Sequence, residues 1–299
     1  AGEGRLIFAC ENTLGLPFLA GEEHDGEESA FTRKEIEAAC EKAGLRHREF
    51  YYPVPEYRLP VSIYSDRRLP AAGDIGTSQA YHGPRYACTD EGKAYEQLVR
   101  EGIFEETAKG FLVCASREEL RERTIFVKYN RTRKEAFRIR TSICEEEGGL
   151  WVEKRALSPA GEEHIRSMER KYEQLKRTNP GVSVLAPQYG TAGDESQSGS
   201  SGKNAGEQEH LSVRFAFVKG RTLADVLAEE LREAAAGRGE TGAPAGQKLC
   251  PWKVQIEAAL DRVLGKAEKT AEGFQPTEGF KEVFGETVPL KDASYAVSN

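Results

Sequence analysis

Residues 4–21 read GRLIFACENTLGLPFLAG and bring an apolar run almost to the start of the chain. Positions 6–10 of this stretch carry no polar side chain. Short apolar runs of this kind are typical of strands that are covered on both faces, as in parallel sheets flanked by helices. We therefore predict that the chain opens on a central strand of an α/β sheet, buried on both faces.

Helices and strands alternate over the rest of the first 118 residues. Thr32 and Glu35 have the spacing of a capping box, and Gly44 supplies a C-terminal stop, so a helix is expected between them. The other expected elements are two extended pieces within 50–65, a helix over 93–106 and a strand over 110–116. This order predicts an α/β domain over residues 1–118.

The pattern changes in the remainder, residues 119–299. The segment FRIRTSI, residues 137–143, alternates apolar and polar positions as antiparallel strands with one buried face do. Pro159 opens a helix that is expected to run to about Arg177. Strands are expected at 124–129, 137–143, 150–157, 182–190 and 211–218, further helices from Thr222 and Pro251, and low-complexity insertions at 191–209 and 232–248. We predict a second domain with a five-stranded antiparallel sheet and one main helix.

Composition limits the classes of function. The chain has 299 residues, a formal net charge of −7 and 38% hydrophobic residues, which is ordinary for a globular protein. The acidic balance does not favour nucleic acid or anionic membranes as partners. No apolar run approaches the ~20 residues of a membrane span, and no secretory signal pattern is present, so we expect a cytoplasmic location. The six cysteines are scattered without a C-x-x-C pair, which disfavours a metal site.

The first domain resembles the end of a class I S-adenosylmethionine-dependent methyltransferase. GEGRLIFACENTLGL, residues 2–16, is similar to the fifth strand of that fold, and residues 34–57 resemble the helix, sixth strand and loop that follow. GFLVCAS, residues 110–116, would be the seventh strand. The resemblance covers residues 3–116 and implies an incomplete Rossmann-like sheet. The loop with the YYPxPxY pattern resembles that of bacterial methyltransferases in polysaccharide assembly, which implies S-adenosylmethionine as cofactor and a sugar, glycan or related small molecule as acceptor.

Two places in this domain are candidates for the acceptor pocket. Glu11 and Asn12 follow the first strand directly, at the strand end where open α/β sheets bind ligands. Asn12 can equally serve to cap a turn there. His24, beside Asp25, is a candidate base or substrate contact, although acidic runs such as GEEHDG are also common in solvated loops.

The second domain resembles the small lobe of aminoglycoside- or choline-kinase-like phosphotransferases. The expected order of three strands, a helix and two strands is that of this lobe, and FAFVKGRTLADVL, residues 215–227, resembles its fifth strand, hinge and following helix. Such a lobe needs a lysine on its third strand that reaches nucleotide phosphates and is held by a helix carboxylate. Lys154 occupies that place, and Glu162 is the preferred partner, with Glu169 as the alternative. The resemblance implies ATP with magnesium as a possible ligand.

Parts of both resemblances are missing. The chain has no G-x-G-x-x-G turn, the turn at 130–135 has no glycine, and no H-x-D…N loop follows the hinge. We therefore expect a fragment of a larger transferase. The parent would pass a methyl group from the sulfonium to an acceptor oxygen by in-line displacement. Phosphorylation of a related acceptor by the second domain is also possible.

Two other function classes remain open on the sequence. The kinase-like lobe can be a non-catalytic, pseudokinase-like binding or scaffold module in cell-surface polysaccharide assembly. The segment 121–140 carries eight Lys and Arg against two Glu with interleaved aromatics, a pattern also seen in RNA-binding strands. Phe137 lies opposite Arg138 and Arg140 in the alternation, which favours a core position over a stacking platform, and we expect no nucleic-acid partner.

Overall fold

The structure is a computed structural model. It describes residues 4–21, 30–76, 90–120, 123–130, 133–146, 148–178, 183–189 and 210–220, and the backbone of 287–290 and 293–296. The expected helices from Thr222 and Pro251, both insertions and His24 lie outside these residues.

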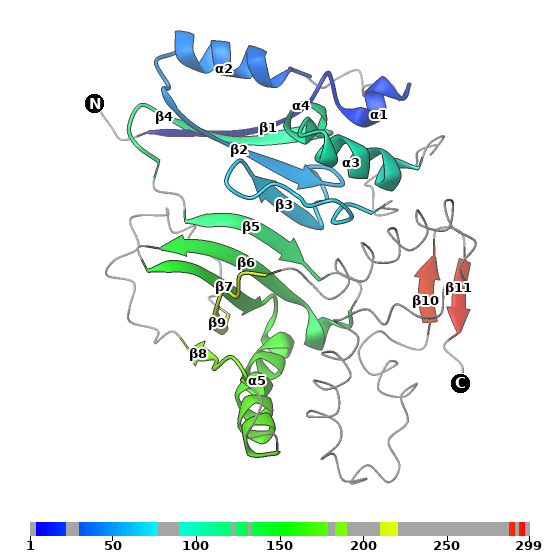
Figure 1. Cartoon of the computed structure of the whole chain (residues 1–299), viewed down its shortest axis with the longest axis vertical. Helices are drawn as coiled ribbons and strands as arrows, with labels where there is room; N and C mark the ends of the chain where they lie inside the picture. Colours follow the sequence, from blue (N-terminus) through cyan, green and yellow to red (C-terminus); the bar gives the residue numbers. More distant parts are fainter. Residues whose placement is uncertain are drawn as a thin grey trace, which may run out of the picture.

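A single open sheet runs through both halves of the described chain (Figure 1). Its strands are β1 (Arg5–Glu11), β2 (His47–Val54), β3 (Ser62–Ser65), β4 (Gly110–Ser116), β5 (Thr124–Tyr129), β6 (Ile139–Glu146), β7 (Gly149–Ala156), β8 (Gln188–Tyr189) and β9 (Ser212–Ala216). They lie in the order β1-β4-β2-β3-β5-β6-β7-β9-β8, and every neighbouring pair is antiparallel. The sequence predicted two separate sheets, whereas β3 and β5 join them into one.

The helices are α1 (Leu16–Leu19), α2 (Arg33–Lys42), α3 (Glu91–Arg100), α4 (Phe104–Thr107) and α5 (Pro159–Thr178), with a 3₁₀ turn, η1, at Glu135–Phe137. A separate hairpin consists of β10 (Thr287–Leu290) and β11 (Ala293–Ala296). Helices α2 and α5 form where the sequence signals them, whereas the single helix expected over 93–106 is divided into α3 and α4, with Gly102 at φ +68° between them. The Thr32–Glu35 capping box starts α2, and Gly44, with φ +74°, follows its end.

Helices α2 to α5 all pack on the same face of the sheet. Pairing registers place Phe8, Phe50, Phe126 and Lys154 on one side, and the core under α2, α3 and α4 is built on this side. The smaller core under α5 uses Ala156, which shares the side of Lys154. We call this side the helix face and the other side the open face. The two halves therefore share one layer of helices over one sheet.

The prediction that the first strand is buried on both faces is wrong for the described chain. β1 is the outermost strand and pairs with β4 alone over its length, apart from a bridge between Glu11 and Ala30. Ile7 points to the open face and is 64% exposed, and Leu6, near the strand start, is 46% exposed. The apolar run identified a strand correctly, but its place in the sheet depends on pairing with distant β4.

Two further expectations changed in the second half. The expected strand at 182–190 is reduced to the two residues of β8, and Phe137 belongs to η1 rather than to β6. Pro187 interrupts the first of these segments, and proline cannot donate a ladder hydrogen bond. The other strands of the second half and α5 lie within three residues of their expected bounds.

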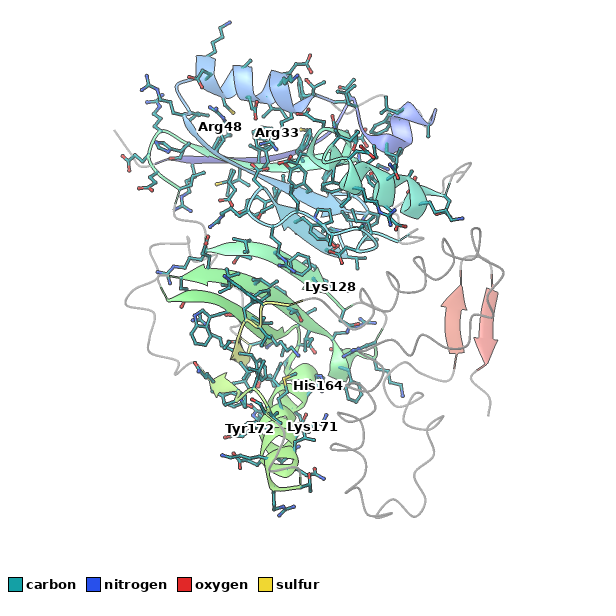
Figure 2. All side chains as sticks on the ribbon, viewed as in Figure 1. Arg33, Arg48, Lys128, His164, Lys171 and Tyr172 are labelled. Carbon is teal, nitrogen blue, oxygen red and sulfur yellow. The ribbon has the colours of Figure 1, made fainter. Side chains whose placement is uncertain are left out.

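A hydrogen-bonded group fastens α2 to the sheet (Figure 2). Arg33 donates to the Tyr52 hydroxyl and forms two bonds with the Asp66 carboxylate, at 2.8 and 3.1 Å. Its guanidinium also lies 4.4 Å from the centroid of the Phe50 ring. Tyr52 is 0% exposed, so its hydroxyl depends on these partners.

We predict that Arg33→Met lowers the free energy of unfolding by about 1–3 kcal/mol, because Tyr52 and Asp66 lose their shared donor in a partly buried setting. Urea denaturation followed by circular dichroism measures this. Lys34→Met is the matched control, since Lys34 is the exposed next residue of α2 and should change stability by less than about 0.5 kcal/mol. Equal effects of the two changes would contradict the prediction.

Candidate functional site

Buried polar side chains gather where β1 and β2 end and β4 begins. Glu11, Asn12, Glu56, Glu91 and Lys109 are all buried. The Lys109 ammonium lies 3.8 Å from the Glu56 carboxylate. The backbone N–H of Asn12 donates to the backbone carbonyl of Lys109 at 2.9 Å. Buried charges are expensive unless they are paired, so their concentration at one strand end marks this edge as a candidate site.

An apolar recess opens beside this group. Pro17, Pro55, Tyr95 and Phe104 contribute its walls, and Lys109 and Glu91 supply charged groups at its lining. Apolar walls with a few convergent polar groups are the usual composition of small-molecule sites. The recess has a volume of about 10 Å³, which is room for one water-sized group, so the ammonium and the carboxylate there are suited to hydrogen-bond a single hydroxyl group.

Asn12 has a structural role at this edge. Its side-chain amide donates to the carbonyls of Glu106 and Ala108, both at 2.8 Å, and its side-chain oxygen accepts from the Leu14 amide at 3.0 Å. With 1% exposure and both donors engaged, the side chain fastens the turn after β1 to the segment before β4. The structure thus places Asn12 in the capping role, while Glu11 stays beside the charged group.

We predict that Asn12→Asp lowers the free energy of unfolding by about 2–4 kcal/mol, because a carboxylate of equal size cannot donate to the two carbonyls. Chemical denaturation measures the loss. Thr13→Ala, at the exposed next position, is the control and should stay within about 0.5 kcal/mol of the wild type. Unchanged stability of the Asn12→Asp variant would contradict the structural role and leave Asn12 as a candidate ligand contact.

Lys154 lies in the middle of β7 on the helix face. In the ladder it is opposite Thr141 of β6 and Val213 of β9. The side chain is half-buried, and its ammonium lies 5.4 Å from the centroid of the Phe215 ring. Burial lowers the pKa of Lys154, and the nearby Arg133 guanidinium lowers it further.

Glu162 is not the partner of Lys154. Its carboxylate accepts from Arg166 at 2.8 Å and contacts His210 at 3.4 Å, and the contact with His210 followed by that with Arg166 lowers the pKa of Glu162. Among the described residues, no carboxylate forms an ion pair with Lys154. The predicted ion pair is therefore absent here, and the rotation of α5 explains why. Ile165 is fully buried against the sheet, which turns Glu162 toward β9.

His164, which sequence reasoning missed, lies on the side of α5 opposite to Glu162 (Figure 2). It is half-buried, and the Phe137 ring of η1 packs edge-on against its imidazole, with the two ring centroids 5.3 Å apart. Burial lowers the pKa of His164, and Lys171, Arg133 and Lys154 lower it further. Its place one residue before core-facing Ile165 is a sequence signal that could have found it.

Comparisons with known proteins give no assignment. No family model, no curated protein and no solved structure matches this chain. Within the described residues, no helix is long and apolar enough to cross a membrane. In that same part of the chain, no three His, Cys, Asp or Glu side chains come together in a way that could hold a metal ion.

We predict that Lys154→Met stabilises the fold by about 0.5–1 kcal/mol at pH 7, because the lowered pKa means that the folded state disfavours the charged ammonium. Since the folded pKa lies below the unfolded value, this penalty should disappear as pH rises toward the ordinary lysine pKa. Thermal unfolding of both proteins at several pH values measures it. Lys42→Met, at an exposed position of α2, should have no such effect. Destabilisation by Lys154→Met would contradict the prediction.

Proposed function

We propose that the first half of this chain is the closing part of a methyltransferase-like unit that acts on a sugar, a glycan or a related small acceptor. The order β1-β4-β2 supports this, since β4 lies antiparallel between two strands that run parallel to each other. The closing strand of class I methyltransferases is inserted in the same way between the fifth and sixth strands. The Glu56–Lys109 pair and the recess beside it are the proposed acceptor side of this unit.

The described residues do not fit S-adenosylmethionine itself. The glycine-rich strand-to-helix turn that holds this cofactor in the family has no counterpart in the sequence. The polar group at the ends of β1 and β2 is therefore assigned to acceptor binding only. No step of methyl transfer is assigned to these side chains.

The second half is proposed to be the small lobe of a kinase-like phosphotransferase. Strands β5, β6 and β7, helix α5, and strands β8 and β9 follow in the expected order, and α5 packs over the strand that carries Lys154. The observation that carries the proposal is the half-buried ammonium of Lys154, which faces the helix from the third strand. When bound, ATP would supply the phosphoryl group, and Lys154 would hold and orient its phosphates.

A non-catalytic binding or scaffold module is the second candidate. One observation favours it: the helix carboxylate that should position Lys154 is engaged elsewhere, with Arg166 and His210. Kinase-like catalysis requires the lysine and its carboxylate partner to be in place together. A lobe without this pair is suited to bind a nucleotide without transferring its phosphate.

Calorimetric titration of the whole chain with ATP tests the nucleotide site. We expect Lys154→Ala to weaken ATP binding by about tenfold or more, because a charge-assisted contact to phosphate is lost. Lys42→Ala is the control and should bind like the wild type. No ATP binding by the wild type, or equal binding by Lys154→Ala, would refute the nucleotide site. ATP binding without phosphate transfer to any sugar or glycan acceptor would favour the scaffold.

A further inference from the structure

The turn after β3 connects distant elements through adjacent side chains. Two backbone hydrogen bonds between Ser65 and Arg68, at 2.9 and 3.2 Å, close this turn. Between them, Asp66 accepts from Arg33 of α2, and Arg67 pairs with one carboxylate of β2 and one of β6, at 2.8 and 2.7 Å. The side chains of Asp66 and Arg67 are therefore each held by an opposite charge.

Arg68, the last residue of the turn, is held by two aromatic rings instead. The Cζ atom of its guanidinium lies 5.6 Å from the centroid of the Phe126 ring and 5.5 Å from that of the Phe217 ring. Among the described residues, no carboxylate forms an ion pair with Arg68, and its guanidinium makes no hydrogen bond. The side chain is half-buried, a setting in which the attraction between a cation and a ring is stronger than in open water.

The two rings come from strands that are not neighbours. Phe126 lies on the helix face of β5, and Phe217 follows the end of β9, while β6 and β7 lie between these strands (Figure 1). The backbone amide of Phe217 donates to the Leu150 carbonyl at 3.1 Å, so the extended chain continues past the last ladder pair of β9. Its side chain then points to the same side as that of Phe215, which is the helix face. A residue of the first half thus contacts the segment that follows β9.

The segment 217–220 has little else to hold it. Val218 is 64% exposed, and the two residues after it are exposed as well. Within the described chain, the polar and ring contacts of this segment are the hydrogen bond to Leu150 and the contact with Arg68. Segments with few contacts open locally at low free energy, so the loss of either contact should be felt in the position of this segment.

We propose that Arg68 is a positioning residue for the nucleotide site of the second half. From the first half, it holds the Phe217 ring and thereby keeps the segment 217–220 in the place where this segment receives the nucleotide base. The inference rests on the proposed function for its ligand, because the segment resembles a phosphotransferase hinge, whereas the contact itself is present without a ligand. A segment that is ordered before the ligand arrives loses less entropy on binding. The nucleotide affinity of the second half therefore depends on a side chain of the first.

Arg67 provides the matched control for this role. It is the same residue type on the same turn, and its guanidinium pairs with Glu49 and Glu145. If Arg68 only stabilised the fold, Arg67→Met and Arg68→Met would differ in degree alone. If Arg68 positions the segment after β9, only Arg68→Met should change that segment beyond the general loss of stability.

Hydrogen exchange measured by NMR on the full chain, without ligand, tests the contact. The amide of Phe217 reports on the segment, and that of Val113, on a fully buried residue of β4, reports on global unfolding. We expect Arg68→Met to speed exchange of the Phe217 amide about fivefold or more relative to the Val113 amide. Arg67→Met should leave this ratio unchanged, and Arg68→Lys, which keeps a cation near the rings, should restore most of the protection. The same ratio in Arg67→Met and Arg68→Met would overturn the inference.

Calorimetric titration with ATP and with adenosine, which has no phosphates, tests the role in binding. We expect Arg68→Met to weaken both ligands about fivefold, Arg68→Lys to recover most of this loss, and Arg67→Met to bind like the wild type. Lys154→Ala should weaken ATP alone. In the wild type, ATP should also slow exchange of the Phe217 amide, a measurement that needs no variant to fold.

The outcomes separate this inference from the proposed function. ATP that binds to the wild type and to Arg68→Met with equal affinity would overturn the role of Arg68 and leave the nucleotide site standing. A loss in Arg68→Met for ATP but not for adenosine would also overturn it, because Arg68 would then act on the phosphates. A wild type that binds neither ligand would refute the nucleotide site, and this role with it, even if the exchange of the Phe217 amide depends on Arg68.

Discussion

The short pairing of β3 with β5 is the contact on which the architecture depends. It consists of two ladder pairs, Ser62 with Lys128 and Ile63 with Val127. The buried Ser65 hydroxyl donates to the Ile125 carbonyl at 2.7 Å, and the rings of Tyr64 and Phe126 pack with centroids 5.1 Å apart. Because strand pairing transmits the alternation of side chains, this junction sets which face of the second half continues the helix face of the first.

The common face places both candidate sites under the same layer of helices. The Glu56–Lys109 pair lies beside α3 and α4, and Lys154 lies beneath α5. The open face instead carries alternating charges, in which Glu153 is buried between Arg140, Arg155 and Arg214. Charges on the open face are therefore neutralised by neighbours, whereas no carboxylate among the described residues forms an ion pair with Lys154. This contrast makes the α5 side the stronger candidate for binding an anion.

The two candidate sites differ in how much freedom their side chains have. At the end of β1, three hydrogen bonds hold the Asn12 side chain. Removal of its donors is therefore expected to lower the stability of the fold and to leave ligand affinity unchanged. Lys154 has the opposite character, because the fold disfavours its charge. A residue that weakens the fold and faces other cations is better explained by a ligand than by packing.

The sequence by itself determined the local elements. The capping box of α2, the alternation in β6 and the start of α5 at Pro159 all act through neighbours along the chain, so they were predictable. Only the tertiary structure decided that β1 is an edge strand and that His164, not Glu162, faces the cations. Positions two apart on a helix point about 160° away from each other, so the partner of Lys154 depends on the rotation of α5, which distant core contacts set.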